Sequence, residues 1–147
     1  MLRHLLLSLI FLLSPLSAEE IAIQLEHAAT PAELAQGLMG RTHLDENAGM
    51  TFNYEGPRFI RIWMYNCQMD LSVAFLDENK VIQAIHELKC YPTIHDPIFF
   101  EQNSVETLKP ASYALEMNPD WFAKNGVAVG DRAEWNIHSS QGKIIKR

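Results

Sequence analysis

Short stretches in which apolar and polar residues alternate run along most of the chain and predict β-strands. Because successive side chains of a strand point to opposite faces, each stretch predicts a strand with one buried face. Two apolar runs, 71–76 and 81–88, flank the polar residues 77–79 and predict a hairpin. The alternating stretches are 21–25, 49–54, 58–64 and 112–117.

Capping residues predict a helix directly after the first strand. Thr30 is a good N-cap, Pro31 suits the first helical position, and Glu33 completes a capping box. We expect this helix to continue to about Met39, where Gly40 supplies the stop.

The remaining segments are assigned from their turn residues and polarity. Residues 90–109 contain prolines and no clean periodicity, and predict an irregular segment that covers the mouth of a binding site. Residues 118–126 predict a second short helix, and 127–137 predict a last strand. Residues 139–147 are polar and predict a loose tail.

Together these elements predict a mainly β protein with a minor α part. We expect a small, mostly antiparallel β-barrel of six to eight strands, closed or nearly closed, with two short helices packed outside. No repeat, linker or change of composition divides the chain, so 19–138 is expected to be one domain, followed by a polar tail at 139–147.

The N-terminus has the order of segments that is typical of a secretory signal peptide. Arg3 precedes an apolar run at 5–13, and small residues ending at Ala18 precede two glutamates. The apolar run is too short to span a bilayer, which takes about 20 residues. Residues 1–18 therefore predict a signal peptide, and a periplasmic or secreted protein with no membrane contact after cleavage. The alternative is an uncleaved anchor or a buried helix.

The net charge of the chain limits the classes of partner that it is expected to bind. The full sequence has 12 Lys+Arg against 18 Asp+Glu, and removing residues 1–18 takes away Arg3, which gives a net charge of −7. Nucleic-acid binders carry basic clusters, so this balance argues against a nucleic-acid partner. It leaves a small polar ligand, a glycan or a protein, and it says nothing about oligomeric state.

Two cysteines, Cys67 and Cys90, remain after the signal segment. In an oxidising compartment an even count favours a disulfide, and a loop of this order stabilises a fold by roughly 3 kcal/mol. The alternative is two free, buried thiols.

Four blocks in order, 30–41, 62–77, 113–122 and 126–131, resemble the DUF192 (UPF0127) family of uncharacterised prokaryotic proteins. The resemblance covers about 21–137. It implies a compact, barrel-like, β-rich fold, and many members carry signal peptides. It implies no settled biochemical activity.

The resemblance also suggests where a site would lie. The family's polar motif positions map onto Arg41, Asn66, Asp70, Glu116 and Asn118. The family pattern usually has a small residue and a proline where this chain has Cys67 and Met69. Cys90 falls in a region where the family often carries cysteine, which implies a lineage-specific disulfide.

Three functions follow as hypotheses. The first is a non-enzymatic module that binds a ligand or partner near Arg41, Asn66, Asp70 and Glu116. A purely structural alternative is that Arg41 pairs with Asp70 or Glu116 to hold the helix on the barrel. The second function is a hydrolase or transferase in which Asp70 and Glu116 act as general acid and base.

The third hypothesis is a copper or redox accessory protein that uses sulfur ligands. Its candidates are Met64, Cys67, Met69 and Cys90. Strand spacing, however, predicts opposite faces for Met64 and Cys67, and no histidine spacing matches a zinc signature. We therefore expect no metal site and no cofactor. The same alternation predicts that Trp63 is exposed.

Overall fold

The structure, a computed structural model, describes residues 17–147. The predicted signal peptide therefore lies almost wholly outside the described residues. Among residues 17–147, no helix is long and apolar enough to cross a membrane. The elements in chain order are β1 (Glu20–Ala28), α1 (Pro31–Gln36), β2 (Ala48–Arg58), β3 (Arg61–Ile62), β4 (Leu71–Leu76), β5 (Ile82–Leu88), α2 (Pro97–Gln102), β6 (Val105–Glu106), β7 (Ala111–Met117), α3 (Trp121–Lys124), β8 (Arg132–Trp135) and β9 (Gln141–Ile145).

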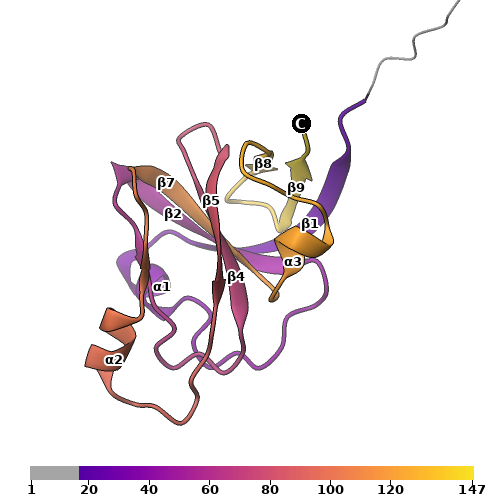
Figure 1. The fold of residues 1–147 in the computed structure, drawn as a ribbon. Coiled ribbons are helices and arrows are strands. Elements are labelled where there is room, and N and C mark those ends of the chain that lie inside the picture. Colours follow the sequence, from indigo (N-terminus) through magenta and orange to yellow (C-terminus); the bar gives the residue numbers. More distant parts are fainter. Residues whose placement is uncertain (1–16) are drawn as a thin grey trace, which may run out of the picture.

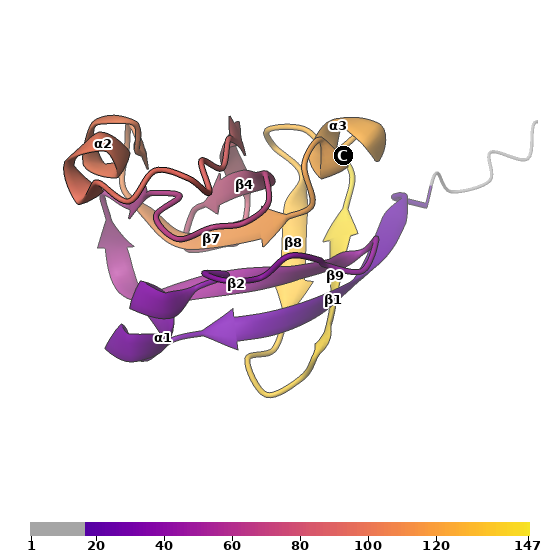
Figure 2. The same ribbon diagram turned by 90° about the horizontal axis from the view of Figure 1, so that it is seen from below.

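Seven strands form one curled sheet in the order β5-β4-β7-β2-β1-β9-β8, and β3 pairs with β6 apart from it. The sheet is a half-barrel (Figure 1), and Figure 2 shows β8 and β9 running across the direction of β1, β2 and β7. Its two edges approach at one end, where Val81 bridges to Arg132 and the Ile82 N–H donates to the Asp131 carbonyl at 2.8 Å. The predicted mainly β, barrel-like fold is confirmed. The pairing is antiparallel except between β1 and β2, which run parallel.

The helices number three rather than two in the described chain. The unexpected helix is α2, inside the segment predicted to be irregular. Asp96 caps it by accepting from the Ile98 N–H at 3.0 Å, and Pro97 occupies the first turn. The signal for α2 was thus present, but it is local and short among several prolines.

The helix α1 begins as predicted and ends earlier. The capping box forms, with the Glu33 N–H donating to Thr30 Oγ1 at 3.3 Å and the Thr30 N–H donating to the Glu33 carboxylate at 3.0 Å. The helix stops at Gln36 rather than about Met39 because Gly37 takes φ +46°, which lies outside the helical region.

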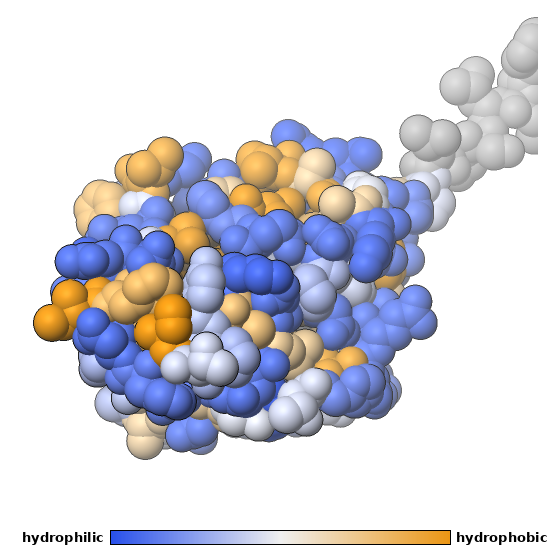
Figure 3. Space-filling view, turned by 60° about the horizontal axis from the view of Figure 1, so that its bottom comes forward, coloured by the Kyte–Doolittle hydropathy of each residue, from blue (hydrophilic) through white to orange (hydrophobic). Residues whose placement is uncertain are grey.

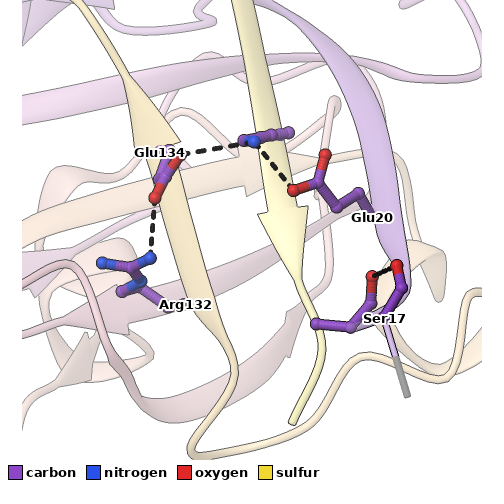
Figure 4. A network of polar contacts seen from close by, with 6 residues as sticks. Ser17, Glu20, Arg132 and Glu134 are labelled. Atoms are coloured by element: carbon purple, nitrogen blue, oxygen red, sulfur yellow. Dashed lines mark hydrogen bonds and ion pairs between the residues drawn. The ribbon is translucent and has the colours of Figure 1, made fainter. Parts of the chain in front are cut away.

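The C-terminal segment differs from the loose tail expected for 139–147. It contains β9, which pairs with β1 on one side and β8 on the other, and Ile144 in it is fully buried. The last strand expected at 127–137 shortens to β8. On the outer surface, Lys143 of β9 contacts Glu20 at 2.8 Å and Glu134 at 3.5 Å, and Figure 4 shows Arg132 joining the same network. Such exposed pairs contribute little to stability.

The two faces of the sheet bury two separate apolar cores. The first core lies under α2 and the 59–70 segment, and it contains Phe52, Ile62, Val73, Phe75 and Phe100. The second lies against α3 and contains Leu76, Leu115, Trp121, Phe122 and Ile144. Register assigns Glu116 to the first face, because it pairs with Met50 on one side and with Val73 on the other. An acidic side chain is thus directed into an apolar core.

Candidate functional site

A small cavity of about 70 Å³ lies between α1, β2 and β3, and Glu116 lines it. Residues 34–39, from α1 and the turn after it, form one wall. Phe52 and Tyr54 come from β2, and Trp63 and Cys67 come from the segment after β3. This cavity is the Glu116 pocket.

Glu116 is the unusual residue of the pocket. It is only 4% exposed, and its carboxyl group forms no hydrogen bond or ion pair with any side chain of residues 17–147. Burial raises the pKa of this carboxyl group to about 8. A buried charge without a partner is costly, so the group is neutral over much of the physiological range.

Two of the neighbouring titratable groups, Tyr54 and Cys67, are neutral as well. Burial, followed by the nearby Glu116, raises the pKa of the Tyr54 hydroxyl to about 12. Burial, followed by Glu116 and Cys90, raises the pKa of the Cys67 thiol to about 12. Arg61, the cation among the described lining residues, forms ion pairs with two carboxylates of the 90–109 segment, Glu106 at 3.2 Å and Glu101 at 3.6 Å.

Arg41 does not join Asp70 or Glu116, which corrects the structural alternative proposed from the sequence. Its guanidinium donates to both carboxylate oxygens of Glu26, at 2.6 and 2.8 Å. This hydrogen-bonded pair lowers the pKa of Glu26 and raises that of Arg41. The parallel β1–β2 pairing positions Glu26 beside Met50, within reach of the turn after α1.

Asp70 binds residues that lie outside the Glu116 pocket. Its carboxylate accepts from Lys89 Nζ at 2.7 Å and from the Cys90 N–H at 2.9 Å. The Lys89 ammonium first, and then the Cys90 N–H, hold the pKa of Asp70 below its usual value. Asp70 therefore ties the end of β5 to the start of β4 and does not line the Glu116 pocket.

The two asparagines hold loops in place. Asn66 adopts φ +55°, and its carbonyl accepts from the Gly40 N–H at 3.0 Å. This hydrogen bond joins the segment after β3 to the turn after α1. The Asn118 side-chain amide donates to the Asp45 carbonyl at 2.8 Å and fixes the loop before β2. Of the five positions taken from the motif, Glu116 alone lines the pocket.

Comparison with known families matches the pattern of this chain over almost its whole length. The family model DUF192, described as "Uncharacterized ACR", matches residues 15–135. The chain belongs to the DUF192 family. The predicted resemblance is thereby confirmed.

Two solved structures share the DUF192 fold seen here. A candidate transcription regulator from Sinorhizobium meliloti 1021 is 25% identical, with a TM-score of 0.64, over 81% of this chain and 95% of that one. A protein of unknown function from Novosphingobium aromaticivorans DSM 12444 is 29% identical, with a TM-score of 0.66, over 77% of this chain and 75% of that one. No curated protein matches the chain significantly.

Several pocket residues of this DUF192 protein were not found from the sequence. Phe52 and Tyr54 lie on a strand far from α1 in the chain, so no local pattern links them to it. In the structure Gly37 packs closely against Phe52, because an added Cβ atom would come within 3.0 Å of the Phe52 ring, but a glycine in the sequence does not identify such a neighbour. Trp63 was predicted to be exposed, and this is confirmed, with 41% of its surface accessible.

The sulfur-containing residues are placed differently from the strand prediction. The strand ends before Cys67, whose N–H donates to the Met64 carbonyl at 3.1 Å in a tight turn. This turn directs Met64 and Cys67 into the same core rather than to opposite faces. Cys67 and Cys90 are both free thiols. Among residues 17–147, no group of three or more His, Cys, Asp or Glu side chains could hold a metal ion.

The segment 90–109 is anchored by an aromatic cluster at the end of the molecule that carries α2. Phe100 is buried in the first core, and the Tyr91 and Phe99 rings pack edge to face with centroids 5.1 Å apart. Ile98 on the outer side of α2 is 62% exposed, and Figure 3 shows apolar atoms gathered at this end, on the left.

Proposed function

We propose that this DUF192 protein is an exported, non-enzymatic module that binds a small ligand in the Glu116 pocket. The supporting observation is a carboxyl group that is almost completely buried, lines a cavity and has no partner in the described chain. Because Glu116 lines the cavity, the hydrogen-bond partners of its carboxyl group come from whatever fills the cavity, either water or a donor group of a ligand. The cavity of about 70 Å³ admits one functional group of a ligand rather than a whole sugar ring.

Two observations weigh against catalysis at this pocket. Asp70 binds Lys89 and the backbone of Cys90, so it is not available to act with Glu116 as an acid–base pair. The thiolate is the reactive form of cysteine, and the pKa of about 12 leaves Cys67 protonated at neutral pH. A net charge of −7 after residue 18 also argues against nucleic-acid binding, and it therefore gives no support to the transcription-regulator role in the description of the Sinorhizobium protein.

Filling the pocket mouth is expected to abolish ligand binding. Ala35 lies on α1, is exposed and lines the pocket, so Ala35→Trp occludes it without disturbing a core. The matched control is Ala32→Trp, on the same helix, exposed and outside the pocket lining. The probes are methylammonium, methanol, acetamide and acetate, followed through the backbone resonances of Tyr54 and Cys67.

At least one probe should shift these resonances in the wild type and in Ala32→Trp, and none should do so in Ala35→Trp. If no probe shifts them in the wild type, or if Ala35→Trp responds as the wild type does, the proposed binding function is wrong.

Export of the mature domain is the second part of this proposal. Its support is the signal-peptide pattern, together with the position at which the folded domain begins. The first residue after the expected cut, Glu19, accepts from the Lys146 N–H at 2.9 Å, and β1 starts at the next residue. Cleavage after Ala18 would therefore leave the whole of β1 in the mature chain.

The intact mass of the exported protein tests cleavage and the disulfide together. We expect a chain that begins at Glu19. We also propose that the two thiols, which are reduced in the structure and pack in or against the first core, become joined in an oxidising compartment, so that this chain weighs less by two hydrogens than the reduced protein. Cys90→Ser should begin at Glu19 and lack the mass difference. Retention of residues 1–18 would contradict export with cleavage, and two free thiols in the untreated, denatured wild type would contradict the bridge.

A further inference from the structure

We infer that the Glu116 pocket selects an organic cation, an ammonium or guanidinium group carried by a small amine or by the end of a lysine or arginine side chain. This inference rests on the proposed function and names the ligand class for the same pocket.

The first argument is the hydrogen-bonding capacity that the pocket leaves unused. A carboxylate accepts several hydrogen bonds, and no side-chain donor of residues 17–147 reaches Glu116. Ammonium and guanidinium groups are rich in N–H donors and carry the opposite charge, so they satisfy both the acceptor capacity and the charge of Glu116. An anionic ligand would instead be repelled by the ionised form of Glu116.

The second argument is the charge balance around the cavity. Its titratable lining groups are Glu116 from β7, Tyr54 from β2, Arg61 from β3 and Cys67 from the segment after β3. The wall at 34–39 contributes no titratable side chain. Tyr54 and Cys67 remain neutral, and the Arg61 charge is balanced by its two glutamate partners. When Glu116 ionises, the local charge is therefore negative.

The third argument is the aromatic surface. Phe52 and Tyr54 line the cavity, and Trp63 lies at its partly exposed side with its ring centroid 5.4 Å from that of Tyr65. Aromatic faces attract cations, and they also pack against the alkyl stem that carries an amine. The small volume fits a charged end group, with the stem lying over Trp63.

Binding of a cation to this pocket is coupled to proton release. A cation pairs with the ionised form of Glu116, whose pKa burial raises to about 8. Below that pH the carboxyl group must lose its proton as the cation enters, so the affinity rises with pH and levels off near pH 8.

The experiment compares methylammonium with methanol, which has nearly the same size and no charge. Affinity is measured by titration of the Tyr54 and Cys67 resonances, and ionisation by the ¹³C resonance of the Glu116 carboxyl group. We expect methylammonium to bind at least about ten-fold more tightly than methanol, and Glu116→Gln to lose that advantage, because close charge pairs contribute more than 1.4 kcal/mol. The matched control is Glu78→Gln, an exposed glutamate in the turn between β4 and β5.

Titrations of the same kind also distinguish the two sources of the cation, a free amine and a peptide side chain. Tighter binding of Nα-acetyl-lysine amide than of methylammonium, reduced by Trp63→Ala, would assign the group to a peptide side chain, and equal binding would assign it to a free amine. Equal binding of methanol and methylammonium, blocked by Ala35→Trp, would overturn the cation and leave the binding pocket intact. Failure of every probe would overturn both. If Glu116→Gln does not fold, proton release on methylammonium binding to the wild type decides, and its absence at pH 6.5 would refute the inference.

Discussion

Glu116→Gln is expected to stabilise the unliganded protein at pH 8 by up to about 5 kcal/mol, and to change its stability little at pH 4. Burial raises the pKa of Glu116 in the folded chain from 4.5 to about 8, whereas the unfolded chain exposes it to water. Below pH 4.5 both states hold the proton. As the pH rises towards 8, only the unfolded state releases it, so the free energy of unfolding falls and levels off above pH 8. Glutamine has no proton to lose and removes this fall.

Urea unfolding at pH 4, 6 and 8 measures the effect. The informative quantity is the difference between wild type and Glu116→Gln, because it cancels the contributions of the other titrating groups. Glu78→Gln is the control and should follow the wild type at all three values. Parallel pH profiles of wild type and Glu116→Gln would mean that the carboxyl group is not neutral and buried as described.

Gly49→Ala is expected to lower the free energy of unfolding by about 1–3 kcal/mol or more. Gly49 in β2 pairs with Met117 of β7, and an added Cβ atom would lie closer than 3.0 Å to both the Glu116 carbonyl oxygen and Met117 Sδ. The methionine side chain can move aside, but the carbonyl belongs to the sheet backbone. Strands β2 and β7 must therefore separate at the base of the Glu116 pocket.

Gly56→Ala is the matched control for this steric effect. Gly56 also lies in β2 and has φ +75°, but nothing lies within 4 Å of an added Cβ atom. Its cost is conformational, about 1 kcal/mol. Urea unfolding compares the two variants, and amide exchange at Thr51 and Leu115 reports on the β2–β7 pairing. A loss for Gly49→Ala no larger than that for Gly56→Ala would contradict the close packing.

Local patterns in the sequence determined most of the individual elements. Alternation along 58–64 predicted that Trp63 is exposed on the face opposite Ile60, Ile62 and Met64, and in the structure these three residues are buried. The capping box at Thr30 and Glu33 is likewise local, and it forms as predicted. The same kind of reasoning missed α2 and β9, where a short capped helix and a polar strand are stabilised mainly by what they pack against or pair with.

The candidate site could be predicted only in part, for a related reason. The family motif drew attention to Glu116, but it did not distinguish it from Arg41, Asp70 and the two asparagines. Those four have partners that lie far along the chain, such as Glu26 for Arg41 and Lys89 for Asp70. A partner of this kind is chosen by strand order, which no local pattern encodes.

By itself, the sequence determined the strand-rich class, the faces of most strands, the start of α1 and the family. These follow from side-chain periodicity, capping chemistry and motif order, all of which act within a few residues. The tertiary structure alone decided that β1 pairs in parallel with β2, that the tail joins the sheet as β9 between β1 and β8, and that Glu116 lines a pocket without a side-chain partner. Each of these depends on register and burial between distant segments, and burial rather than residue type makes the Glu116 carboxyl group a neutral acid that lacks a partner.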